Sequence, residues 1–111
     1  MCIRDRQGIG QALGEVLLYD AESGQAMTAS LMDYTLPRAE IIRTFVHVLD
    51  QSIPCQNNPL GVKGVGELGT IGATPAVVNA VADALIRAGH AEGAGRLQMP
   101  LTAGKVWLAL Q

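Results

Sequence analysis

The chain has 111 residues, enough for one domain with a modest core. Its net charge is −2. Only 16% of its residues are charged, against about 25% in a usual soluble domain. The chain should therefore either bury much of its own apolar surface or rest against a larger body. Lysines and arginines are scattered singly, which argues against nucleic-acid binding, and no apolar run reaches the roughly 18 residues of a membrane span.

The cysteines and histidines form no pattern typical of a metal site. Cys2 and Cys55 are isolated from each other, and His47 and His90 have no ligand-type neighbours in the sequence. We therefore expect no zinc site and no disulfide framework. Cys55 is interpreted as an ordinary packed or exposed thiol.

The start of the chain divides into two parts. Residues 1–6, "MCIRDR", lack periodicity and the apolar region of a signal peptide, and they resemble a translated adapter sequence at the end of an assembled read. We expect 1–6 to be a non-native leader and 7–111 to be the native segment. Apolar residues recur at helical spacing in 7–19, which predicts a helix. Its glycines each cost a helix up to about 1 kcal/mol, which indicates close packing against a neighbour.

The middle of the chain predicts irregular structure and one strand. Residues 20–25 are typical of a turn, and 26–41 should form short extended pieces that end near Pro37. Residues 43–51 alternate between two sets of side chains, which predicts a strand covered on both faces near its centre. His47 is then a packed strand residue rather than a ligand.

A strongly apolar helix is predicted over 74–88. Thr74 is a suitable N-cap, Pro75 fits the first helical position, and Gly89 fits the position just beyond the end. The polar residues form one narrow stripe, so the helix should be buried on most sides. A chain of this length has difficulty covering such a helix alone.

The remaining elements complete the predicted fold. A short extended piece is expected over 97–99, followed by a last helix that Thr102 caps. Val106, Trp107 and Leu110 should pack inward from that helix. Together the elements predict an α+β fold, in which helices pack on short strands.

The stretch "NPLGVKGVGELGTIG" contains a G-x-G-x-x-G pattern at Gly64, Gly66 and Gly69. A dinucleotide site would also need a buried strand before the glycines and an acidic residue after a second strand, and neither is present. No Gly-Lys-Ser/Thr closes the pattern as a phosphate-binding loop. Both phosphate interpretations are therefore disfavoured.

Two interpretations of this stretch remain open from the residues alone. The glycines could form a plain connector, with Glu67 a solvated acid or a partner of a helix dipole. Alternatively, Glu67 could be a general base held in an apolar pocket. The N–H groups of Gly64, Val65 and Gly66 could then bind the oxygens of an anionic ligand.

Four segments in succession point to a family: "QGIGQALGEVLLYD", "GQAMTASLMDYTLPRA", "NPLGVKGVGELGTIGATPAVVNAVADAL" and "MPLTAGKVWLAL". They resemble, in family order, the C-terminal part of the molybdopterin-binding (large) subunit of the xanthine dehydrogenase family. This family includes aldehyde oxidases and aerobic carbon monoxide dehydrogenase. The resemblance runs over 7–111 and implies a C-terminal fragment of a larger molybdopterin-binding subunit.

The resemblance implies a function and its residues. The full subunit would be a molybdenum hydroxylase that oxidises an aldehyde, an N-heterocycle or a related small substrate with oxygen from water. Glu67 would be the general base at the molybdenum centre. The implied cofactor-binding residues are Lys63, Gly64, Val65, Gly66 and Gln7, and no residue of this chain is expected to ligate the metal.

The resemblance also implies a cofactor and partners. The cofactor would be molybdopterin, with the cytosine dinucleotide form expected. Iron–sulfur clusters and FAD would lie on partner subunits or domains, because their ligands are not in this chain. Partners would be the remainder of the large subunit and the iron–sulfur and flavin subunits, in the cytoplasm or alternatively the periplasm. The fragment alone should be inactive, and the competing interpretation is a non-catalytic structural or interaction domain of the same fold.

Overall fold

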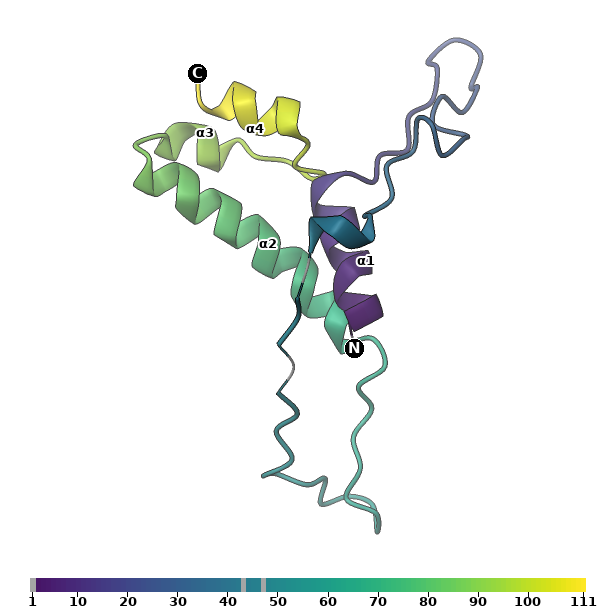
Figure 1. Ribbon diagram of the computed structural model, residues 1–111, viewed down its shortest axis with the longest axis vertical. Coiled ribbons are helices and arrows are strands. Elements are labelled where there is room, and N and C mark those ends of the chain that lie inside the picture. The colour runs from purple at the N-terminus through teal and green to yellow at the C-terminus, as the bar shows by residue number, and fades with distance from the viewer. Residues whose placement is uncertain (1, 43, 47) are drawn as a thin grey trace.

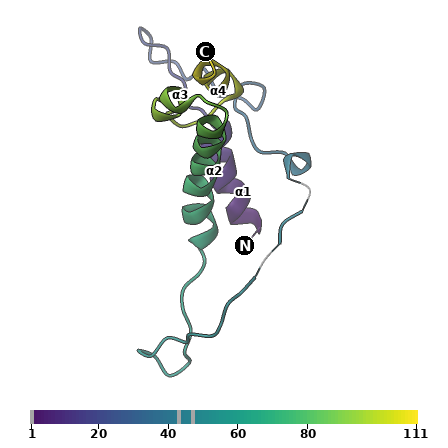
Figure 2. The same cartoon turned by 90° about the vertical axis from the view of Figure 1, so that its left-hand side faces the viewer.

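The structure is a computed structural model that describes residues 2–42, 44–46 and 48–111. It is mainly helical, and its elements are α1 (Cys2–Leu13), the 3-10 helix η1 (Ala39–Ile41), α2 (Leu68–Arg87), α3 (Ala91–Gly95) and α4 (Ala103–Ala109). α1 lies beside the first part of α2, while α3 and α4 fold back at the other end of α2 (Figures 1 and 2). Two long loops, before and after η1, project away from these helices (Figure 1).

The predicted strand over 43–51 is wrong for the residues that the structure describes. Residues 44–46 and 48–51 have no regular structure, whereas positions 43 and 47, and with them the interpretation of His47, lie outside the described residues. A strand needs a neighbour for its N–H and C=O groups, and pairing in the described part is limited to one isolated bridge, between Tyr19 and Ala26. The α+β assignment is therefore not confirmed, and 97–99 is likewise irregular.

α1 begins and ends earlier than the predicted 7–19 helix. It takes in 2–6 and stops at Leu13, where the N–H groups of Gly14 and Glu15 both bond to Gly10 O at 2.9 Å. Gly14 is a weak helix former, so the apolar residues beyond it do not continue the helix, and Leu17 is 66% exposed. The identification of 1–6 as a non-native leader stays a prediction.

The contact between α1 and α2 is made by small residues. A Cβ built on Gly8 would lie 2.9 Å from both Ala73 Cβ and Thr70 O, which confirms the close packing predicted for the glycines of this region. The hydroxyl of buried Thr74 lies 3.1 Å from Gly8 O and 3.2 Å from Thr70 O, so it can bond across the interface or along its own helix. Ala12 is fully buried.

This packing predicts the effect of a bulky residue at Gly8. Gly8→Val should destabilise the complete subunit by about 1–3 kcal/mol, because the α2 backbone at Thr70 must move to admit the side chain. Gly72→Val on α2 is the control, since no atom of this chain lies within 4 Å of a Cβ there. Thermal unfolding followed by calorimetry measures the difference, and an unchanged midpoint for Gly8→Val would contradict the observed helix contact.

α2 begins at Leu68, six positions before the predicted start at Thr74. Thr74 is therefore not an N-cap but an interior residue, and Pro75 lies inside the helix at the cost of one backbone hydrogen bond. The predicted end is confirmed: Ala88 caps the helix, and Gly89 follows with φ +93°. That left-handed conformation favours glycine.

The described residues do not cover α2 on most sides, which agrees with the expectation that a chain of this length has difficulty covering the helix alone. Its buried residues are Gly69, Thr74 and Leu85, whereas Ile71 is 65% exposed. α2 is also long and apolar enough to cross a membrane, with a mean hydropathy of 1.3. A single helix of this kind is weak evidence for a span, because the core helix of a soluble protein has the same length and composition.

The C-terminal helix confirms one sequence prediction and contradicts another. Thr102 caps α4, since its hydroxyl oxygen accepts from the Lys105 N–H at 3.5 Å. Trp107, however, is 60% exposed rather than packed inward. α3 approaches α4 through the backbone, with Gly93 directly against Ala109, so this close contact is made by these two residues rather than by the indole.

The loop before η1 is tied to the end of α1 by a side-chain bond. Tyr34 donates its hydroxyl to Glu15 Oε2 at 2.6 Å, across 19 positions of sequence. This hydrogen bond raises the pKa of Tyr34, because loss of the proton would place two anions side by side. The same loop turns as predicted at 20–25, where Gly24 has φ +70°.

Candidate functional site

Glu67 lies where the second long loop returns to the helical body and α2 begins (Figures 1 and 2). It occupies the N-cap position with φ −104° and ψ −6°, and its carbonyl oxygen accepts from the Ile71 N–H at 3.1 Å. Its side chain makes no capping hydrogen bond and is exposed. The backbone of Glu67 is therefore fixed by α2, while its carboxylate is directed to no group of the described chain. The residues that the structure describes do not form the apolar pocket expected around Glu67.

The two glycines before Glu67 have no explanation within the described chain. A Cβ built on Gly64 or Gly66 would meet no atom within 4 Å, and neither residue has a positive φ. Alanine would therefore fit at both positions in this structure. Glycine at such positions is explained if a group from outside the chain approaches the backbone closely.

The backbone N–H groups of this segment are also available to a ligand. Among the described residues, the N–H groups of Gly64, Val65 and Gly66 donate no hydrogen bond. N–H groups without a protein partner can donate to the oxygens of an anionic ligand. The residues present therefore fit an anionic group placed next to Glu67.

Lys63 and Gln7, the other predicted cofactor-binding residues, already have partners. The Lys63 ammonium donates to Ile53 O at 2.6 Å, which joins the two arms of the long loop. Gln7 lies on α1 and its side-chain oxygen accepts from Arg4 at 3.2 Å. Gln7 precedes Gly8, which packs on the second turn of α2, so α1 brings it to the same end of the helix pair as Glu67 (Figure 1). In the described chain no hydrogen bond joins Gln7 to 63–67.

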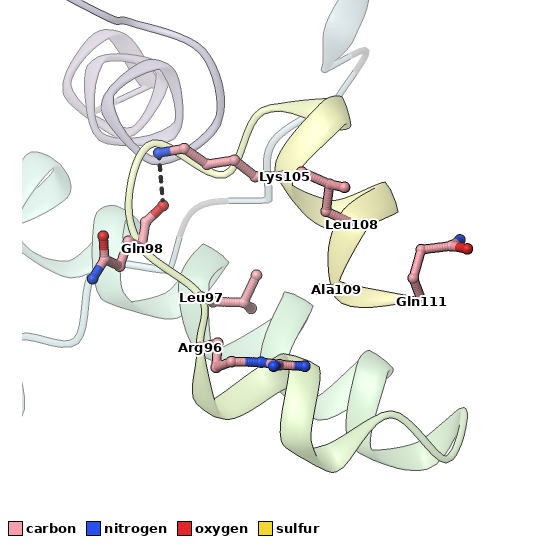
Figure 3. Close-up of a pocket in the computed structure, with 8 residues that line it drawn as sticks. Arg96, Leu97, Gln98, Lys105, Leu108, Ala109 and Gln111 are labelled. Carbon is pink, nitrogen blue, oxygen red and sulfur yellow. Dashed lines mark hydrogen bonds between the residues drawn. The ribbon is translucent and has the colours of Figure 1, made fainter.

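A cavity of about 450 Å³ lies elsewhere, between α3 and α4 (Figure 3). Its cations have partners, because Lys105 donates to Gln98 O at 3.1 Å and Arg96 pairs with Glu92 at 3.4 Å. The cavity is open to solvent and lies at the far end of α2 from Glu67 (Figure 1). We therefore place the candidate site at Glu67 and not in this cavity. Within the described residues no group of His, Cys, Asp and Glu is arranged to hold a metal ion.

The loop before Glu67 contains a pair of side-chain hydrogen bonds from Asn58 that the sequence analysis does not predict. The side chain of Asn58 donates to Val62 O at 2.9 Å and accepts from Val62 N–H at 3.2 Å. The sequence Asn58-Pro59-Leu60-Gly61 predicts no more than an irregular loop. Asn in a turn is nevertheless a residue type that forms such side-chain-to-backbone bonds.

Comparison with known proteins gives consistent matches. The family model of the molybdopterin cofactor-binding domain matches residues 6–43. The chain is 37% identical over 105 residues to the 6-hydroxypseudooxynicotine dehydrogenase complex subunit gamma of Paenarthrobacter nicotinovorans, which covers 95% of this chain and 12% of the relative. It is 38% identical over 99 residues to the carbon monoxide dehydrogenase large chain of Afipia carboxidovorans. That match covers 86% of this chain and 11% of the relative.

A third relative is the nicotine 6-hydroxylase large subunit of Paenarthrobacter nicotinovorans, which is 39% identical over 100 residues. That match covers 90% of this chain and 12% of the relative. The chain thus spans only about an eighth of the length of these proteins. The matches to the relatives extend well beyond the 6–43 region that the family model covers.

Proposed function

Because the chain belongs to the family of molybdopterin-binding subunits of xanthine dehydrogenases, carbon monoxide dehydrogenases and aldehyde oxidoreductases, we propose that it forms the C-terminal part of a molybdenum hydroxylase large subunit. Glu67 is the general base of that enzyme. The remainder of the subunit supplies the rest of the cofactor site and the substrate pocket, since the relatives are about eight times longer than this chain.

One observation carries this proposal. Three successive N–H groups without a partner, at Gly64, Val65 and Gly66, lead directly into an exposed carboxylate whose backbone is fixed at the start of α2. The open space at both glycines leaves room for a bulky group beside that carboxylate. The proposal thus explains why the two residues are glycines although nothing in the described chain requires it.

The residues of this chain have separate tasks in the proposed reaction. When bound, the molybdenum cofactor supplies the two-electron oxidation, with the oxygen coming from water. The N–H groups of 64–66 would hold anionic oxygens of the cofactor, and Lys63 and Gln7 would contribute to the same site. Glu67 accepts the proton that the water-derived oxygen must lose before it can attack carbon, which is the work of a positioned general base.

The substrate, the partners and the form of the cofactor belong to the same proposal. The substrate is an aldehyde, an N-heterocycle or a related small molecule, and the names of the three relatives refer to nicotine-type heterocycles and carbon monoxide. The cofactor is the cytosine dinucleotide form of molybdopterin. Electrons leave through iron–sulfur and flavin subunits, in line with the naming of the relatives as subunits of complexes. We place the enzyme in the cytoplasm, with the periplasm as the alternative.

Cofactor retention tests the proposed site directly. Gly66→Val in the complete subunit should lower the molybdenum content about tenfold, which corresponds to about 1.4 kcal/mol of binding free energy. A Cβ at this position meets no atom of the described residues within 4 Å, so a clash of that atom within them would not explain a loss of molybdenum. Gly104→Val on α4 is the matched control, since it also has open space but lies far from Glu67 (Figure 1). Equal metal contents by mass spectrometry would argue for the non-catalytic domain instead.

A further inference from the structure

The second long loop contains a closed unit at its far end, here named the distal loop (53–63). Cys55 N–H donates to Gly61 O at 2.9 Å, and Gly61 N–H donates to Asn58 O at 3.2 Å. Lys63 Nζ reaches back to Ile53 O at 2.6 Å and closes the base of the loop. Gly61 has φ +65°, and a Cβ there would lie 3.2 Å from Pro54, so the turn depends on glycine.

Asn58 holds the last part of this loop. Its side-chain amide bonds to both polar groups of Val62: Nδ2 donates to Val62 O at 2.9 Å, and Oδ1 accepts from Val62 N–H at 3.2 Å. Two such bonds fix the peptide planes on both sides of Val62, as a neighbouring strand would. Asn58 is half-buried, whereas the adjacent Asn57 is exposed and makes no hydrogen bond in the described structure.

The 63–67 segment therefore spans the distance between two anchors. One is the pair of bonds from Asn58 to Val62, and the other is the first turn of α2, with Leu68 N–H donating to Val65 O at 3.3 Å. Among the described residues the N–H groups of 63–67 donate no hydrogen bond. The segment contains two glycines, which are the most flexible residues, so its path is set by where its two ends are held.

We propose that Asn58 is a positioning residue for Glu67, acting through Val62 and the 63–67 segment. The inference rests on the proposed role of Glu67 as general base. A general base must lie within hydrogen-bond reach of the proton that it accepts, and a displacement of about 1 Å can cost about 10²-fold in rate. Asn58 does not touch the cofactor site. It fixes the end of the distal loop from which the 63–67 segment departs.

The test compares three variants of the complete subunit loaded with cofactor. Asn58→Ala removes both bonds to Val62, Asn58→Asp keeps only the acceptor for Val62 N–H, and Asn57→Ala is the matched control. We expect kcat to fall about 10- to 100-fold for Asn58→Ala and by an intermediate factor for Asn58→Asp. KM should change less than about twofold, because a displaced base impairs the chemical step and not substrate binding. The value of kcat is expressed per bound molybdenum, since the 63–67 segment also carries the N–H groups proposed to hold the cofactor. Asn57→Ala should behave as the unchanged enzyme.

Amide hydrogen exchange gives a second readout that does not depend on catalysis. The Val62 N–H donates to Asn58 Oδ1, so its exchange should become faster in Asn58→Ala and stay unchanged in Asn57→Ala. Unchanged exchange together with unchanged kcat in Asn58→Ala would overturn the inference. Loss of folded protein in both Asn58 variants would also overturn it, since Asn58 would then support the fold.

The inference and the proposed function can fail separately. If Glu67→Gln is inactive while Asn58→Ala retains full kcat, Glu67 remains the base and the positioning role of Asn58 is wrong. If Glu67→Gln is fully active, the proposed function fails, and the exchange experiment then still decides whether Asn58 holds the 63–67 segment.

Discussion

Glu67→Gln in the complete subunit is expected to lower kcat by about 10²- to 10⁴-fold while the molybdenum content stays that of the unchanged protein. Glutamine has nearly the size and shape of glutamate but cannot accept a proton at its amide. The side chain of Glu67 makes no capping bond to α2, so the substitution should leave the start of the helix intact. Steady-state turnover and metal analysis of the same preparation measure both quantities.

Glu92→Gln is a suitable control for this experiment. Glu92 is also an exposed acid and is paired with Arg96, but it lies on α3 at the far end of α2 (Figure 1). It should retain full turnover. If Glu67→Gln retains turnover, Glu67 is not the general base. A complete subunit that holds no molybdenum and turns nothing over would favour the non-catalytic interpretation.

The second large effect concerns the chain on its own. Expressed without the remainder of a subunit, the 111-residue chain should aggregate or melt without a cooperative transition. The buried apolar residues in the described part are Ala12, Leu85 and Leu101, whereas Met32 and Val46 are 95% and 88% exposed. Exposed apolar surface on this scale is a liability for aggregation and typical of a surface that a partner covers.

Size-exclusion chromatography and thermal circular dichroism test this expectation. Co-expression with the preceding part of the subunit is the control, and it should return the chain to the soluble fraction. A monomeric product of the isolated chain with a sharp unfolding transition would contradict the prediction. In that case the exposed residues would have to be covered by a rearrangement within the chain itself.

The features of the fold that sequence analysis predicted correctly have local causes. The end of α2 depends on Gly89 in a left-handed conformation, and the start of α4 depends on the Thr102 hydroxyl. Both signals act within one turn of helix. They could therefore be interpreted without knowledge of any neighbour.

The features that were predicted wrongly depend on contacts between distant parts of the chain. The first turn and a half of α2 contains Gly69 and Gly72, and Thr74 followed by Pro75 resembles a helix start. Packing of Thr70 and Gly69 on α1 extends the helix upstream, and this packing is invisible in a local pattern. The alternation in 43–51 likewise predicts a strand only where a second strand is available to pair with it.

The candidate site also contains features that the sequence predicts and features that depend on contacts seen in the structure. Glu67 was found because its glycine-rich surroundings resemble a family motif, and the structure adds the free N–H groups and the open space around the glycines. Lys63 was predicted to lie at the cofactor and in this structure bonds to Ile53 O. The contribution of Asn58 required coordinates, because an Asn in a loop has many possible partners.

The contact between α1 and α2 has a consequence for how the molecule is made. Gly8 and Thr74 meet across 66 positions of sequence, so the helix that supports Glu67 gains its neighbour only after nearly two thirds of this segment has been synthesised. Contacts of such long range are slow to form, since the intervening chain must first lose its freedom. Assembly around Glu67 should therefore come late in folding, and a cell has to keep the unfinished subunit from aggregating until this contact closes.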